Sequence, residues 1–172
     1  MTTTAADSDT ELAACVLALV GANALSSREL SEWIDRQIML RPEPPRWLLD
    51  ASLAVLTEDK LHHVRLVPSA LETSLDPFLI LHASLLAYKR GRTRSEHLAS
   101  RALHTAWDHR LPDDLRDAIY ELDEDATCAH DYDGISQPDR VARSVALLDA
   151  RLAAQSKWRT LIEACVTAAP CT

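Results

Sequence analysis

Glycine is the residue that most constrains the fold of this chain, because only three occur in 172 residues: Gly21, Gly91 and Gly134. A fold built from β-hairpins needs many turns with positive φ, and glycine adopts such angles most readily. Leucine and alanine dominate the apolar residues, and both favour helix over strand. The sequence therefore predicts an all-α fold.

Hydrophobic periodicity, capping residues and prolines divide the chain into about seven helices. Two segments, Ser8-Asp9-Thr10-Glu11 and Ser26-Ser27-Arg28-Glu29, have the pattern of a capping box. In such a box a hydroxyl and a carboxylate bond the free amides of the first turn. The expected helices begin near Ser8 and Ser26, span about 46–56, 76–90 and 95–109, and begin again at Pro112 and near Pro138.

The helix at 76–90 is expected to be central. Asp76 and Pro77 suit the N-cap and the first helical position, and residues 78–87 are apolar almost all round. Such a helix cannot lie on the surface without exposing a large apolar patch. We therefore predict that Leu81 and Leu85 are buried.

Three further segments carry specific expectations. The helix at 46–56 has little polar face, so we expect it to be well buried and to pack on the preceding helix, with Trp33 and Trp47 near the join. Residues 61–67 fit a short strand or an irregular turn that Pro68 closes, and the conformation of 61–75 as a whole stays open. The last helical region carries two apolar stripes that a straight helix cannot bury together, which predicts a bend or break near 155–157.

The length of the chain fits a single domain, 1–172, with loosely held ends at 1–7 and 168–172. The N-terminus lacks the basic and apolar regions of a signal peptide, and no apolar run reaches about 18 residues. None of the four cysteines forms a CxxC pair, and Cys15 lies in an apolar run typical of a core position. We expect a cytoplasmic protein with free thiols.

Motifs for catalysis and cofactor binding are missing from the sequence. Three scattered glycines cannot form a P-loop or a dinucleotide-binding loop, and neither GxSxG nor HExxH occurs. We therefore expect no cofactor and no metal, and the sequence favours a protein that is not an enzyme. The net charge of −8 also argues against nucleic acid, whose phosphates would repel the chain.

The helix at 95–109 carries histidines on one face. His97, Arg101, His104 and Asp108 fall within about a quarter turn of one another. The opposite face is apolar and comprises Leu98, Ala102, Leu103, Ala106 and Trp107. We interpret the histidine face as solvent-facing. A metal held by His104 and Asp108 is the alternative, which the neighbouring guanidinium opposes.

Two other features admit a chemical and a structural interpretation. His82 lies in the most apolar helix, where a hydrogen-bonded core histidine is expected and a general base in a closed pocket is the alternative. The loop 130–134 has the aspartates and glycine of an EF-hand, but Ala129 and Arg140 stand where its first and last carboxylates belong. We interpret this loop as a turn.

Charge segregation is the clearest feature of the surface. Nine carboxylates lie between residues 113 and 133, opposed by Arg116 alone, whereas four cations form a basic turn at 89–94. Cations favour a helix C-terminus, and an RNA or phosphate site is the alternative for the basic turn. The candidate partner-binding residues are Asp113, Asp117, Glu121, Asp123, Glu124, Asp125, Asp131 and Asp133.

The leading interpretation is a small acidic protein that binds another protein, in particular an immunity-type protein that covers a basic toxin with its acidic surface. A second version is an adaptor or assembly subunit, in which the acidic run meets the basic turn of a neighbouring copy. The rival class is an enzyme that uses His82, or a metal held by His104 and Asp108. We expect a protein partner and neither nucleic acid nor membrane, and a homo-oligomer stays open.

Overall fold

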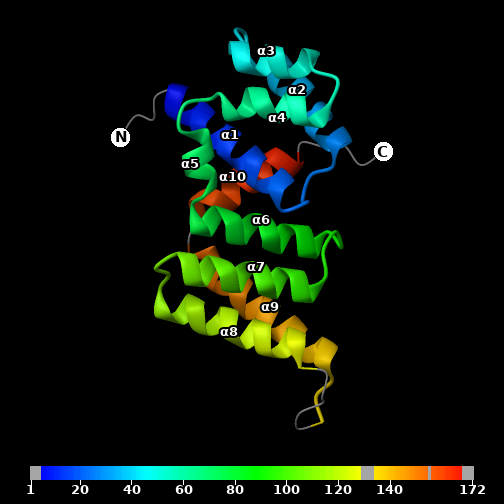
Figure 1. Ribbon diagram of the computed structural model, residues 1–172, viewed down its shortest axis with the longest axis vertical. Helices are drawn as coiled ribbons and strands as arrows, with labels where there is room; N and C mark the ends of the chain where they lie inside the picture. Colours follow the sequence, from blue (N-terminus) through cyan, green and yellow to red (C-terminus); the bar gives the residue numbers. More distant parts are fainter. Residues whose placement is uncertain (1–4, 129–133, 155, 168–172) are drawn as a thin grey trace.

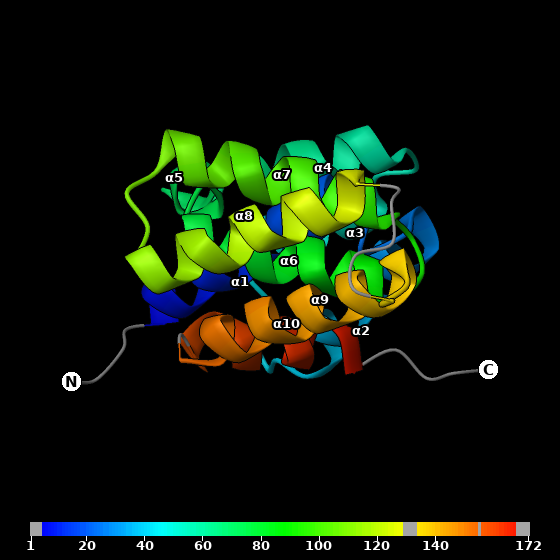
Figure 2. The same ribbon diagram turned by 90° about the horizontal axis from the view of Figure 1, so that it is seen from below.

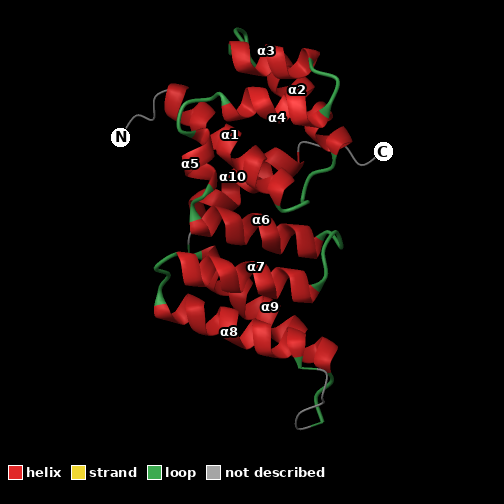
Figure 3. Ribbon diagram, viewed as in Figure 1, coloured by secondary structure: helices red, strands yellow, loops and turns green. Residues whose placement is uncertain are grey.

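The structure, a computed structural model, describes residues 5–128, 134–154 and 156–167. Ten helices and no strand occur in this part of the chain (Figures 1 and 3). They are α1 (Ala5–Gly21), α2 (Ser27–Met39), α3 (Arg46–Leu53), α4 (Thr57–Arg65), α5 (Ala70–Ser74), α6 (Pro77–Lys89), α7 (Ser95–Asp108), α8 (Asp113–Thr127), α9 (Gln137–Ala153) and α10 (Ser156–Thr167). The all-α prediction is confirmed, but seven helices were too few, because α4 and α5 were not expected and the last region is two helices.

The segment 61–67 is largely helical because α4 continues to Arg65, so the strand and the irregular turn expected there are both wrong. α4 begins at Thr57, with Glu58 and Asp59 in its first turn, where carboxylates favour the positive end of the helix dipole. Leu61 and Val64 are both buried. A strand would place two residues with this spacing on opposite faces, whereas a helix places them on one.

α6 lies in the middle of the molecule, between α3 at one end and α8 at the other (Figure 1). Asp76 caps it, because its carboxylate accepts hydrogen bonds from the amides of Phe78 (2.9 Å) and Leu79 (3.2 Å). One face of α6 packs into a core with α1–α5 and α10, and the other into a core with α7–α9. Leu81 and Leu85 are 0% and 2% exposed, as predicted. Because both cores share α6, the described helices form a single domain.

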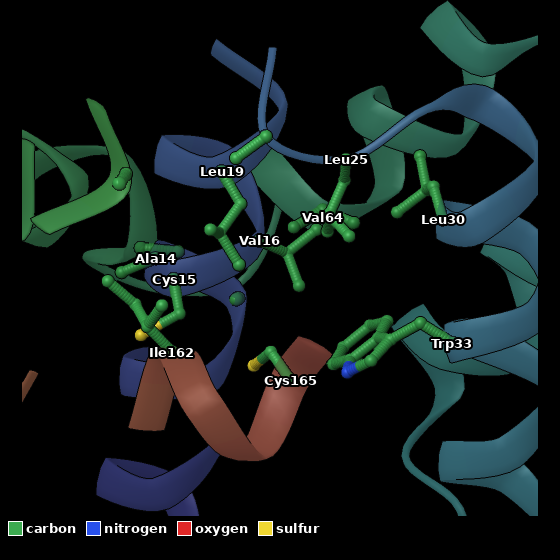
Figure 4. Close-up of a cluster of buried hydrophobic side chains, with 14 of the residues drawn as sticks. Ala14, Cys15, Val16, Leu19, Leu25, Leu30, Trp33, Val64, Ile162 and Cys165 are labelled. Atoms are coloured by element: carbon green, nitrogen blue, oxygen red, sulfur yellow. The ribbon is translucent and has the colours of Figure 1, made fainter. Parts of the chain in front are cut away.

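The larger core surrounds α1 (Figure 4). Trp33 of α2 is buried within it, and Trp47 of α3 packs against it. Cys15 of α1 and Cys165 of α10 are buried in the same core. The prediction that Cys15 is a core residue is therefore confirmed. α2 and α3 pack on each other, as expected, and Trp33 and Trp47 contact the same core.

The first two helices differ in how well their start was predicted. α1 begins at Ala5, so Ser8 lies inside the helix and the capping box expected there is wrong. The box at Ser26 is confirmed: its hydroxyl accepts from the amide of Glu29 at 3.3 Å, and its own amide donates to the Glu29 carboxylate at 2.7 Å.

The C-terminal helices agree with the sequence except at one boundary. The acidic residues and turn formers of 123–137 predict a loop over this whole segment, but α8 continues to Thr127, so residues 123–127 are helical and that part of the prediction is wrong. The break expected near 155–157 is confirmed, because α9 ends at Ala153 and α10 begins at Ser156. α8 and α9 pack against each other (Figure 2), and α8 lies at the end of the molecule remote from α3 (Figure 1).

α3 is shorter and more exposed than predicted. It ends at Leu53, and Ala54 is extended with a ψ of 134°. Only Leu48 and Ala51 of this helix are buried, whereas Leu53 is 82% exposed. The expectation that 46–56 is well buried is therefore wrong.

Candidate functional site

Large apolar side chains gather on the surface of the elements α2, α3 and α4. Val55 is 89% exposed and Met39 is 85% exposed. α3 packs on both α2 and α4, and these three helices lie together at one end of the molecule (Figure 1). We name this set of exposed residues the apolar corner: Met39, Leu40, Leu49, Leu53, Val55, Leu56 and Leu66.

The local structure explains why these side chains point outward. α3 has only eight residues, and Leu48 and Ala51 take its inner face. Leu49 and Leu53, four residues apart, share the outer face. The chain then turns extended, so residues 55 and 56 lie in the connection to α4 rather than in a helix that could bury them.

An open groove runs beside the apolar corner, between α3 and α4. Its volume is about 400 Å³, and Leu53 and Ala54 supply apolar surface to it. Asp50, Asp59 and His63 line its polar side. A protruding apolar residue from another protein would fit such a groove while the surrounding apolar corner covers its neighbours.

Charges around the apolar corner are balanced. Residues 39–66 contain four carboxylates and four Lys or Arg residues. Arg41 pairs with Asp9 at 2.6 Å, and the longer pair between Arg46 and Asp50 measures 3.5 Å. The surface is therefore apolar and close to neutral, whereas the chain as a whole carries a charge of −8.

The predicted acidic surface lies at the other end of the molecule, on α8. Asp113, Asp117, Glu121 and Glu124 are exposed along one side of this helix, and Asp123 is half-buried. Asp113 forms an ion pair with Arg116 at 2.5 Å. We name the three residues spaced at four-residue steps, Asp113, Asp117 and Glu121, the acidic edge. Asp131 and Asp133 lie outside the described residues.

Asp125 differs from the other predicted partner-binding residues, because its carboxylate is turned into the protein and is only 16% exposed. It accepts hydrogen bonds from Arg140 Nε at 3.0 Å and from the hydroxyl of Ser144. Both donors belong to α9 and are buried. Asp125 therefore joins α8 to α9 and does not form part of the acidic edge.

The basic turn at 89–94 is engaged in internal ion pairs. Arg90 and Arg92 both bind the Glu29 carboxylate, at 2.8 Å and 2.7 Å, and Lys89 binds Asp149 at 2.7 Å. Three of its four cations thus have partners within the protein. The alternative functions of this turn, binding phosphate or the acidic run of a second copy, would have to displace these pairs.

Glu29 is the centre of this ionic contact, which we name the Glu29 clamp. Burial alone would raise the pKa of Glu29, but hydrogen bonds from the Ser26 amide and hydroxyl and from Arg92, with the charge of Arg90, outweigh it and lower the pKa to about 2. The clamp ties the start of α2 to the connection between α6 and α7.

The histidine face of α7 is exposed, which confirms the solvent-facing interpretation of His97, His104 and Asp108. Trp107 was expected on the apolar side, but it is 63% exposed and lies edge-on to the His104 ring, with 5.5 Å between centroids. The prediction for Trp107 is wrong because it follows His104 by less than one turn and faces outward with it.

Other chemistry has little support among the described residues. No group of three His, Cys, Asp or Glu side chains in 5–128, 134–154 and 156–167 is placed to hold a metal. His82 is buried and also lines a small pocket together with Lys89 and Asp149, so its interpretation as a core histidine and the alternative of a general base both stay open. A hydrogen bond with the Cys165 thiol raises the pKa of Cys15, and burial raises it further. The reactive thiolate form of Cys15 is therefore disfavoured. No helix in the described part is long and apolar enough to cross a bilayer.

Sequence reasoning missed the apolar corner, although its residues were visible as an apolar segment without a polar face. We interpreted that pattern as burial inside the chain. Comparison with known proteins adds nothing to the geometry, because no family model, no curated protein and no solved structure matches this chain.

Proposed function

We propose that this chain is a protein-binding protein that docks its partner through the apolar corner. The observation that supports the proposal is the exposure of seven large apolar side chains on α2, on α3 and on the residues that adjoin α2, α3 and α4. Large exposed apolar patches are uncommon on monomeric proteins and mark interaction sites. Burying one exposed leucine contributes roughly 1.5–3 kcal/mol, so a few such residues supply a useful part of the binding energy.

The chemistry of the apolar corner suits one class of partner. Balanced charge gives little electrostatic steering, so the partner is a folded protein with a complementary apolar surface and an apolar side chain that enters the α3–α4 groove. The hot-spot residues are Leu49 and Leu53, which share the outer face of α3, and Val55 beside them.

The acidic edge supports a second candidate function, the binding of a basic protein. Its three carboxylates are exposed and share one side of α8, as an immunity-type protein would need. It lies at the opposite end of the molecule from the apolar corner (Figure 1). One compact partner cannot cover both, so use of both surfaces would make the chain an adaptor between two proteins.

Site-directed photo-cross-linking tests the proposal. A photoreactive amino acid replaces Leu53 in one variant and Asp117 in a second, and the exposed Arg143 of α9 in a control. Each variant is irradiated in cells that produce the protein, the cross-linked protein is identified by mass spectrometry, and the partner is then purified for light scattering with the wild-type chain.

We expect one partner to be captured at position 53 and to form a stoichiometric complex with the wild-type chain. Capture at position 117 alone would transfer the proposal to the acidic edge. A cross-link from position 53 to a second copy of this chain, together with a dimer in light scattering, would overturn it, because the apolar corner would then be a self-interface.

A further inference from the structure

A pocket separate from both candidate docking surfaces lies between the end of α1, the connection of α6 to α7, and α7 itself. Its volume is about 370 Å³, within the range of small-molecule sites. α7 contributes His97, Arg101 and His104, spaced so that all three share one face. The α1 end contributes Asn23, which is held at a φ of +62°.

The polar lining of this pocket carries no carboxylate among the described residues. Arg101 supplies a guanidinium, His97 and His104 supply imidazole rings, and Thr93 and Ser100 add hydroxyl groups. Asp108 continues the same face of α7 but does not line the pocket. The positive charge of Arg101 is therefore not balanced by any carboxylate of the described lining, which suits an anionic group.

Arg101 is positioned by the fold. Its Nη1 donates a hydrogen bond to the carbonyl of Gly21 at 2.7 Å, at the last residue of α1, where the helix dipole is negative. Partial burial lowers the pKa of Arg101. No carboxylate of the described chain pairs with it. The fold therefore covers part of this cation and offers it one carbonyl, while a guanidinium has five N–H donors.

We propose that this pocket binds a small phosphate ester, with its phosphoryl group on Arg101. The planar guanidinium matches two phosphoryl oxygens, and His97 and His104 flank it on the same face. Hydroxyl groups of Thr93 and Ser100 can donate to the third oxygen, and Leu98 and Ala22 offer apolar surface to the rest of the molecule. This site is independent of the apolar corner and of any protein partner.

The test is isothermal titration calorimetry of the purified full-length chain with ribose 5-phosphate. Ribose tests the need for the phosphoryl group, inorganic phosphate tests the need for the ester, and gluconate tests whether a carboxylate suffices. Arg101→Gln removes the charge, and Arg143→Gln removes an exposed arginine of α9 as a matched control.

We expect ribose 5-phosphate to bind with a Kd of about 1 mM or below, Arg101→Gln to weaken binding about tenfold or more, and Arg143→Gln to leave it unchanged. Ribose should not bind. Equal binding by Arg101→Gln, or tighter binding of gluconate than of the phosphate ester, would overturn the proposal, and so would the lack of any binding.

A measurement on the wild-type chain avoids dependence on a folded variant. Addition of ribose 5-phosphate should shift the imidazole NMR signals of His97 and His104. The signals of His62 and His63, which do not line the pocket, should stay in place. Shifts of equal size at all four histidines would indicate nonspecific anion binding and contradict the assigned site.

Discussion

At the scale of single residues, the Glu29 clamp shows how one side chain serves two levels of structure. Glu29 completes the capping box of α2 through Ser26, and it also binds two arginines from the connection of α6 to α7. The capping role is visible in the local sequence, because Ser26 and Glu29 are three residues apart. The ionic role joins residues more than sixty positions apart and is visible only in the fold.

The clamp predicts a specific dependence of stability on pH. The pKa of Glu29 falls from an ordinary 4.5 to about 2 on folding, so its contribution is complete above pH ~4.5 and is lost as the pH falls towards 2. Glu29→Gln should lower the free energy of unfolding by roughly 1–2 kcal/mol at pH 7, less than the full pKa shift implies because solvent screens this ionic contact, and the difference from wild type should shrink at pH 3.

Urea unfolding at the two pH values checks this prediction. Glu32→Gln is the matched control, because Glu32 pairs only with the exposed Arg28 on the same helix and should change stability little at either pH. A difference between wild type and Glu29→Gln that is the same at pH 7 and pH 3 would show that the clamp does not hold the carboxylate in its ionised form.

At the scale of helices, α6 and α3 are both rich in apolar residues, but α6 is buried and α3 has an exposed outer face. α6 is covered on both faces by two cores, whereas the outer face of α3 is covered by nothing in the described chain. Leu85 of α6 is 2% exposed and Leu53 of α3 is 82% exposed, so the two leucines report on these two environments.

The same substitution at both positions should give very different results. Leu85→Ala should lower the free energy of unfolding by roughly 2–5 kcal/mol, because it removes buried apolar contacts and leaves a cavity. Leu53→Ala should change it by less than about 0.5 kcal/mol, since the side chain is already in water. Chemical denaturation measures both, and a loss below ~1 kcal/mol for Leu85→Ala would place α6 at the periphery.

The contrast between these helices also shows what the sequence could predict. α6 was predicted with its cap and its buried leucines because Asp76, Pro77 and an apolar run are local signals. An apolar segment such as 46–56 indicates that its surface will be covered, but not whether the same chain or another molecule covers it. The sequence also predicts that Asp113, Asp117 and Glu121 lie on one side of their helix, because they are spaced at four-residue steps. It does not predict α4, because the short apolar segment there also fits a strand.

Candidate sites depended still more on the tertiary structure. The Asp125 carboxylate points into the protein because it accepts hydrogen bonds from Arg140 and Ser144, which lie fifteen and nineteen residues further along the chain. The histidine face of α7 was predicted from its spacing, but its pocket is completed by residues 21–23 from another helix end. No local pattern of either segment indicates that they meet.

At the scale of the whole molecule, the fold separates three surfaces of different chemistry. The apolar corner lies at one end, the acidic edge lies at the other, and the cationic pocket opens beside α7 between them (Figure 1). Copies that joined the acidic run of one chain to the basic turn of another would have to displace the internal ion pairs of that turn. Binding through one end therefore leaves the other end accessible to a second molecule.

The most direct test of the central claim is the Kd of the partner captured at position 53, measured for three forms of the purified chain. Leu53→Asp should raise the Kd at least about tenfold, because it places a charge in the apolar contact. The double charge reversal of Asp117 and Glu121 to Lys should leave the Kd close to that of wild type. Unchanged binding by Leu53→Asp, with binding lost or slowed on charge reversal, would contradict the account and assign the partner to the acidic edge.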